Sequence, residues 1–153
     1  MLVFNESSVI VNQDIPDAQT VITRLAEQLH LQGLVSSDYG NQTWARELKH
    51  PTGLPTSPFP IAFPHADAEG VNQSSLAVAI LQNSVKFKNM ADPDEDLDVS
   101  IVLMLANKSP EEQIQTLRNL ALLFGQPEKL KELQTQITEQ AVVDWLKREL
   151  HLE

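Results

Sequence analysis

The four histidines are the residues of this sequence best suited to nucleophilic chemistry near neutral pH. The chain has no cysteine, which excludes thiol nucleophiles, thiolate zinc sites, iron–sulfur clusters and disulfides. His30 falls near the end of an amphipathic segment, His50 opens a proline-rich stretch, and His151 lies in the final three residues. His65 differs, because it follows an apolar run and a proline and has small residues around it. We expect its imidazole to lie at the end of a strand, although the residues alone leave an incidental role open.

Other site chemistries have weaker support. No two histidines lie at the four-residue helical step of a metalloprotease motif. The acidic run from Asp92 to Asp98 lacks the regular oxygen spacing and central glycine of an EF-hand, so we interpret it as a solvated turn. No GxxxxGK or GxGxxG phosphate loop occurs. Composition leaves a Ser–His–Asp hydrolase open, but the sequence has no GxSxG elbow. We therefore predict neither a metal nor a cofactor.

Length and charge limit the class of protein. The 153 residues suit a single domain, which we place at residues 1–153. Eleven basic and twenty-one acidic residues give a net charge of −10, which disfavours nucleic acid and anionic membrane surfaces as partners. No apolar run approaches the roughly 18 residues of a membrane span, and the first residues do not resemble a secretory signal. We expect a cytoplasmic protein that is not inserted in the membrane.

The first part of the chain predicts a strand, two helices and a rigid loop. Apolar residues at three- and four-residue steps indicate a helix over residues 16–31, with Pro16 in its first turn and Gly33 as its stop. A short strand at residues 9–11 precedes it. A second helix, capped by residues 36–38, should run through Leu48. The next eleven residues, 50–60, contain four prolines, so we expect an ordered surface loop.

Strands and then helices follow the loop. Residues 76–81 and 101–106 are continuous apolar runs, typical of strands covered on both faces, and the second should be the sheet centre. Residues 61–63 form a shorter strand. Residues 85–87 should pair with 76–81 as a hairpin through residues 82–84.

The last third predicts three helices, the first with a capping box of Ser109, Pro110 and Glu112, the last capped by Thr138. Helices on both sides of the strands indicate an α/β (α+β) domain with a mixed sheet.

Three linked motifs around His65 resemble a known family. Arg46 and Glu47 form an RE pair, residues 52–56 read TGLPT, and residues 61–65 read IAFPH. In this order and spacing they resemble the enzyme IIA domain of the mannitol–fructose type in the bacterial sugar phosphotransferase system. The order of helices and strands on both flanks agrees, so the resemblance covers nearly the whole chain. It implies the mannitol-type enzyme IIA fold, in which helices flank a mixed sheet in three layers.

The resemblance also implies a phosphoryl relay. The family histidine accepts a phosphoryl group from HPr and donates it to a cognate enzyme IIB, which phosphorylates the sugar entering through the membrane IIC permease. By the motif, His65 is that histidine, and a neutral imidazole is a competent nucleophile. Arg46 matches the family arginine, whose guanidinium can hold phosphoryl oxygens. Thr52 matches the motif threonine, which donates its hydroxyl to the phosphoryl group or stabilises the turn.

One position departs from the mannitol and fructose pattern. Those members carry a second histidine near the start of the helix after the last strand, where this chain has Gln113. Glutamine can donate a hydrogen bond to a phosphoryl oxygen but cannot carry a proton. This substitution resembles the galactitol branch, so galactitol is the expected substrate of the transport system. A regulatory, nitrogen-related enzyme IIA and an interaction domain with an inert His65 stay as alternatives.

Overall fold

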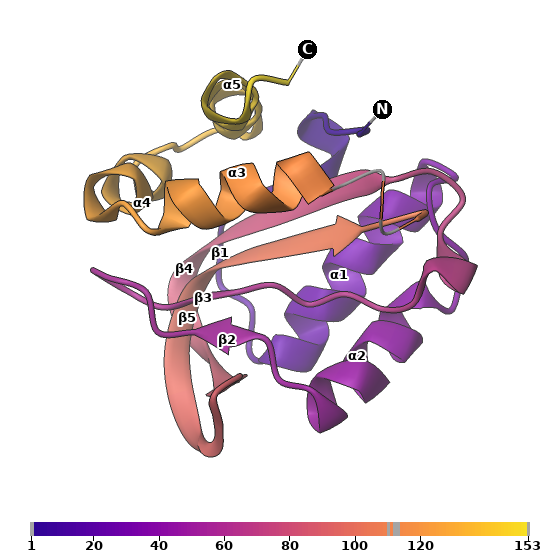
Figure 1. Ribbon diagram of the computed structural model, residues 1–153, viewed down its shortest axis with the longest axis horizontal. Coiled ribbons are helices and arrows are strands. Elements are labelled where there is room, and N and C mark those ends of the chain that lie inside the picture. The colour runs from indigo at the N-terminus through magenta and orange to yellow at the C-terminus, as the bar shows by residue number, and fades with distance from the viewer. Residues whose placement is uncertain (1, 110, 112–113, 153) are drawn as a thin grey trace.

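A mixed five-stranded sheet lies between two layers of helices, as Figure 1 shows for the computed structural model. The structure describes residues 2–109, 111 and 114–152. The strands are β1 (Val9–Gln13), β2 (Gly53–Leu54), β3 (Ile61–Ala62), β4 (Ser75–Asn89) and β5 (Asp92–Ala106). Helices α1 (Ala18–Leu31) and α2 (Tyr39–Lys49) cover one face, and α3 (Ile114–Phe124), α4 (Pro127–Gln134) and α5 (Glu139–Leu150) cover the other. The short 3₁₀ turns are η1 (Glu6–Ser8) and η2 (Ala68–Gly70).

The two long strands form the centre of the sheet. β4 and β5 pair antiparallel, β1 lies parallel to β4, and β3 lies parallel to β5. β2 pairs antiparallel with β3, and its Gly53 also pairs with Asn89 at the end of β4. The predicted mixed sheet, with the apolar run 101–106 in its interior, is therefore confirmed.

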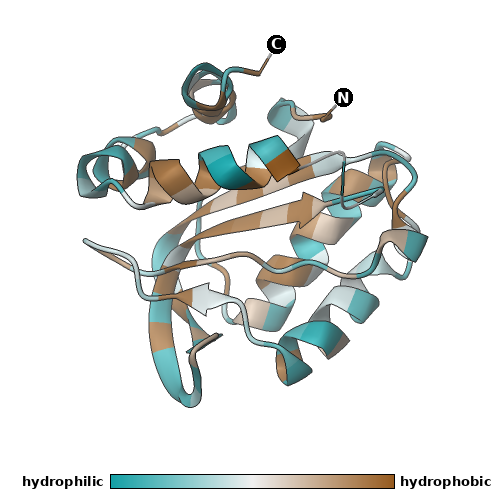
Figure 2. Cartoon of the chain, viewed as in Figure 1, coloured by the Kyte–Doolittle hydropathy of each residue, from teal (hydrophilic) through white to brown (hydrophobic). Residues whose placement is uncertain are grey.

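Each central strand contributes to two separate cores, one on each face of the sheet. The odd-numbered residues from Ile101 to Leu105 pack toward α3, α4 and α5, whereas the even-numbered residues from Val102 to Ala106 pack toward α1 and α2. Successive side chains of a strand point to opposite faces, so a strand covered on both sides has no polar positions. Figure 2 shows the resulting hydrophobic band along the sheet.

The predicted ends of α1 and the predicted start of α5 agree with the structure, with one shift, whereas Asp38 precedes α2 without a side-chain capping bond in the described chain. α1 begins at Ala18, because the Asp17 carboxylate accepts the Thr20 N–H at 2.8 Å and so acts as the cap, which leaves Pro16 outside the helix. Gly33 ends this helix with φ of 75°, a conformation that glycine adopts without strain. Thr138 caps α5, as predicted, by accepting the Ala141 N–H.

The predicted hairpin through residues 82–84 is wrong. β4 continues through these exposed residues to Asn89, and the register with β5 shifts between Ile80 and Val85. The chain reverses only at residues 90–91, so the acidic run belongs to strand β5 and is not a turn. Residues 92–96 are all exposed near the tip of the hairpin, and beyond them the exposed Asp98 alternates with the buried Leu97 and Val99.

Two further predictions concern the loop and the capping box. The proline-rich loop contains one short strand, β2, which the prediction lacked. Position 53 requires glycine, because a Cβ there would lie only 2.5 Å from the Lys88 carbonyl oxygen. Pro110 and Glu112 of the predicted capping box lie outside the described residues.

Within the described part of the chain, no helix is both long and apolar enough to cross a bilayer.

Candidate functional site

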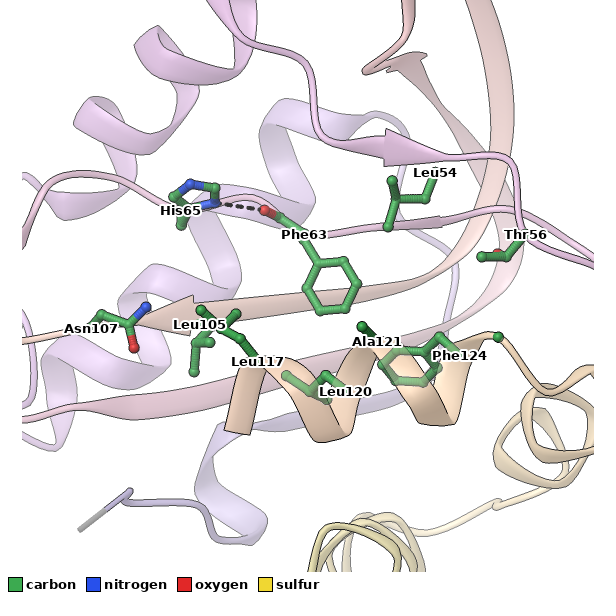
Figure 3. A pocket seen from close by; sticks show the side chains of 11 residues that line it. Leu54, Thr56, Phe63, His65, Leu105, Asn107, Leu117, Leu120, Ala121 and Phe124 are labelled. Carbon is green, nitrogen blue, oxygen red and sulfur yellow. Dashed lines mark hydrogen bonds between the residues drawn. The ribbon is translucent and has the colours of Figure 1, made fainter. Parts of the chain in front are cut away.

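His65 lies just beyond the end of β3, half-buried and held by one backbone contact (Figure 3). Its Nδ1 lies 2.9 Å from the carbonyl oxygen of Phe63. Because a carbonyl can only accept a hydrogen bond, Nδ1 carries the proton, and the neutral ring has its lone pair on Nε2. The backbone thus selects one nitrogen of the ring as the nucleophile.

An apolar cavity of about 480 Å³ adjoins the imidazole, between the β2–β3 segment and helix α3. The rings of Phe63 and Phe124 form part of its wall, with centroids 5.7 Å apart. Apart from His65, the described residues that line it with polar side chains are Thr56 and Asn107, which follows β5. Figure 3 shows the nitrogen of the Asn107 amide on the side facing His65. The Asn107 Oδ1 atom is buried and has no hydrogen-bond partner among the described residues.

Arg46 reaches the same region from helix α2. Its Nη1 lies 3.8 Å from Oδ1 of Asp67, two residues after His65, and this pair is loose because the Asp67 side chain is 88% exposed. The Arg46 Nε atom is buried without a hydrogen-bond partner in the described chain. A guanidinium held here has N–H donors to spare for an incoming anion.

Thr52 is engaged elsewhere. Its hydroxyl and its N–H both donate to the Glu47 carboxylate, each at 2.8 Å, and both residues are buried. Burial raises the pKa of Glu47, an effect that the two hydrogen bonds from Thr52 oppose. The TGLPT motif has two threonines. Among the described residues that line the cavity, Thr56 is present and Thr52 is not. This geometry favours the turn-stabilising alternative for Thr52.

Helix α2 supplies a third contact through Tyr39. The fully buried Tyr39 hydroxyl accepts the N–H of Ala66, directly after His65, at 3.2 Å. Burial is also the main reason that the pKa of Tyr39 is raised. Tyr39 and Arg46 are seven residues apart, which places them on one face of the helix two turns apart. Helix α2 therefore holds the segment directly after His65 at two points, Ala66 and Asp67.

The structure accounts for the predicted residues unevenly. It brings His65 and Arg46 to one end of the sheet, whereas Gln113 lies outside the described residues. Tyr39 and Asn107 were not predicted as site residues. A tyrosine at the start of a helix and an asparagine after a strand are common, so neither position carried a sequence signal.

The other histidines lie at helix ends. Nδ1 of His30 pairs with the Val35 carbonyl at 3.0 Å, and His50 and His151 are exposed C-caps of α2 and α5. Within residues 2–109, 111 and 114–152, no three histidine or acidic side chains cluster closely enough to hold a metal ion.

Comparison with known proteins places these features in a family. Residues 2–149 match the family described as phosphoenolpyruvate-dependent sugar phosphotransferase system, EIIA 2. The galactitol-specific EIIA component of the phosphotransferase system from Escherichia coli strain K12 is 31% identical over 122 residues, which cover 80% of this chain and 79% of that protein.

Solved structures show the same fold at lower identity. The mannitol-specific cryptic phosphotransferase enzyme IIA CmtB from Escherichia coli superposes with a TM-score of 0.78 at 23% identity, covering 95% of both chains. Enzyme IIAMTL, in complex with phosphorylated enzyme IIBMTL from Escherichia coli, superposes with a TM-score of 0.72 at 19% identity over 99% of each chain. The predicted mannitol-type enzyme IIA fold is thus confirmed.

Proposed function

This chain belongs to the EIIA 2 family of the phosphoenolpyruvate-dependent sugar phosphotransferase system, and from that premise we propose that it is a histidine phosphocarrier. It accepts a phosphoryl group from phospho-HPr on His65 and passes it to a cognate enzyme IIB. The observation that carries the proposal is the ring's hydrogen bond to the Phe63 carbonyl, because it leaves Nε2 as the nucleophile. We assign residues 1–153 to one such domain, acting in the cytoplasm.

The transfer is a displacement at phosphorus. The Nε2 lone pair forms the new N–P bond as the bond between phosphorus and HPr breaks, and HPr keeps the electron pair of that bond. The phosphorylated ring retains its Nδ1 proton and is cationic, so the Phe63 carbonyl oxygen stabilises it through a stronger, charge-assisted bond. Transfer to enzyme IIB breaks the N–P bond and restores the neutral ring. Phosphoryl transfer of this kind depends mainly on positioning and charge stabilisation.

Three side chains are proposed to bind the phosphoryl oxygens. Arg46 supplies a guanidinium whose ion pair with Asp67 is a loose 3.8 Å contact, and phosphate oxygens fit its fork of donors. Asn107 supplies amide N–H groups at the cavity beside His65. Gln113 keeps its predicted place as a third donor. We propose a positioning role for Thr52, because its hydroxyl already donates to Glu47.

The apolar cavity beside His65 supports docking of protein partners. Ile114 and Leu117 on α3 are 48% and 45% exposed, next to the cavity that Leu117 itself lines. A modest apolar interface suits a carrier that must release each partner after transfer. Because the relative from strain K12 is named galactitol-specific, we propose galactitol as the substrate of the transport system, in which this domain need not contact the sugar.

Phosphate labelling tests the proposal. Incubation with ³²P-labelled phospho-HPr should give an acid-labile, alkali-stable label that is lost in His65→Ala and kept in His50→Ala, since His50 is an exposed histidine outside the cavity lining. Absence of label on the wild-type protein, or equal label in His65→Ala, would refute it and favour the inert interaction domain. ³¹P–¹⁵N correlation should place phosphorus on Nε2. Labelled protein that does not transfer to a galactitol-type enzyme IIB would favour the regulatory alternative.

A further inference from the structure

Four hydrogen bonds link a buried carboxylate on α2 to the His65 ring. The Thr52 N–H and hydroxyl donate to Glu47, each at 2.8 Å. The Thr52 carbonyl accepts the Phe63 N–H at 3.3 Å, and the Phe63 carbonyl accepts Nδ1–H of His65 at 2.9 Å. From this chain of contacts, and building on the proposed phosphocarrier function, we propose that Glu47 is a positioning residue that sets the tautomer and orientation of the His65 imidazole.

Burial gives the first link its strength. Glu47 is 6% exposed and Thr52 is 7% exposed, so water cannot easily replace either partner. A carboxylate has two acceptor oxygens, and Thr52 satisfies one with its N–H and the other with its hydroxyl. Such a bidentate pair fixes both the position and the rotation of the Thr52 peptide unit. The next link is the longest of the four, so it depends most on Thr52 being held.

The last hydrogen bond, from Nδ1–H of His65 to the Phe63 carbonyl, determines which ring nitrogen can attack phosphorus. An unconstrained imidazole in water prefers its proton on Nε2, whereas transfer through Nε2 requires the proton on Nδ1. The Phe63 carbonyl enforces the second tautomer only while it points at the ring. β3 pairs with β2 and with β5, but both ladders end at Ala62, one residue before the Phe63 carbonyl. The Glu47–Thr52 pair adds the missing restraint at the end of the ladder nearest His65.

Tautomer populations and phosphorylation rates test the proposal together. ¹⁵N NMR of the unphosphorylated protein reads the His65 tautomer directly, and phospho-HPr labelling gives the rate per folded molecule. Glu47→Ala should raise the fraction of the Nε2–H tautomer and slow phosphorylation by about tenfold, since a displacement of about 1 Å can cost up to about a hundredfold. Thr52→Val, which loses the hydroxyl donor alone, should shift both readouts in the same direction by less. Thr52→Ser keeps both donors and should restore wild-type values.

Controls separate this proposal from its alternatives. Glu69→Gln removes the same charge from an exposed acid four residues after His65 and should change neither readout. If folded Glu47→Ala keeps the wild-type tautomer and rate, Glu47 is structural only and the proposal is overturned. Should Glu47→Ala fail to fold, an unchanged tautomer in Thr52→Val overturns it equally. Failure of the wild-type protein to accept phosphate would instead refute the phosphocarrier function, because the tautomer shift does not depend on phosphorylation.

Discussion

Replacement of Arg46 by methionine should stabilise the fold while it impairs phosphoryl transfer. The Arg46 side chain is 38% exposed, its Nε is buried without a partner in the described chain, and its contact with Asp67 is a loose 3.8 Å pair. An unpaired buried donor costs about 1–3 kcal/mol, whereas an exposed ion pair contributes about 0.5 kcal/mol. Methionine keeps the aliphatic packing and removes both terms. The free energy of unfolding should therefore rise by about 1 kcal/mol, or about 3 °C in Tm.

The same substitution removes the proposed contacts with phosphoryl oxygens. Charge-assisted hydrogen bonds contribute about 1.5–3 kcal/mol, so Arg46→Met should slow phosphorylation by phospho-HPr by about 30-fold, which corresponds to about 2 kcal/mol. Thermal denaturation and labelling rates on the same preparation measure both effects, with Arg24→Met as a control on an exposed arginine of α1. If Arg46→Met is less stable than the wild type and is phosphorylated at the wild-type rate, both the expected gain in stability and the expected loss of transfer rate are refuted.

Three further substitutions test the packing and the buried charge. Phe124→Ala should lower the free energy of unfolding by about 3 kcal/mol in urea titrations, because a buried ring is removed. Gly53→Ala should destabilise the fold and slow labelling, since its Cβ would lie 2.5 Å from the Lys88 carbonyl oxygen. The raised pKa of Glu47 predicts a pH effect. Folding favours its neutral form relative to the unfolded chain, so the stability gained from that form is complete below about pH 4.5 and is lost as pH rises through the folded pKa. Urea titrations should therefore show Glu47→Gln gaining stability relative to wild type as pH increases from 4.5 to 7; a constant difference would contradict this.

The fold was predictable where local patterns agree with the tertiary arrangement. Helix periodicity located α1, α2 and the last three helices. Uninterrupted apolar runs located the first half of β4 and the last part of β5, which pair with each other. The hairpin prediction failed at residues 82–84, whose polar composition is typical of a turn. These residues lie at an irregularity of the β4–β5 ladder, where the strand continues because Val85 and Phe87 find buried partners on β5. A short polar sequence cannot report such a distant pairing.

The site was predictable in its reactive groups but not in their supports. His65 and Arg46 carried a motif, and the structure brings Arg46 beside Asp67, next to the histidine. Tyr39 and Asn107 gave no signal, because their contacts join residues far apart in the chain. Tyr39 meets Ala66, 27 residues further along the sequence, only because the fold brings α2 beside the segment that follows β3.

The amino-acid sequence by itself determined the kind of chemistry, because residue types set what a side chain can do: an imidazole to attack, a guanidinium to bind anions, and no thiol or metal motif. It also determined the alternation of helices and strands, which follows from local periodicity. Only the tertiary structure decided which nitrogen of His65 keeps its lone pair and which groups hold the ring. Those choices rest on hydrogen bonds between segments that the fold brings together, and hydrogen bonds depend on distance and angle, which no linear order of residues specifies.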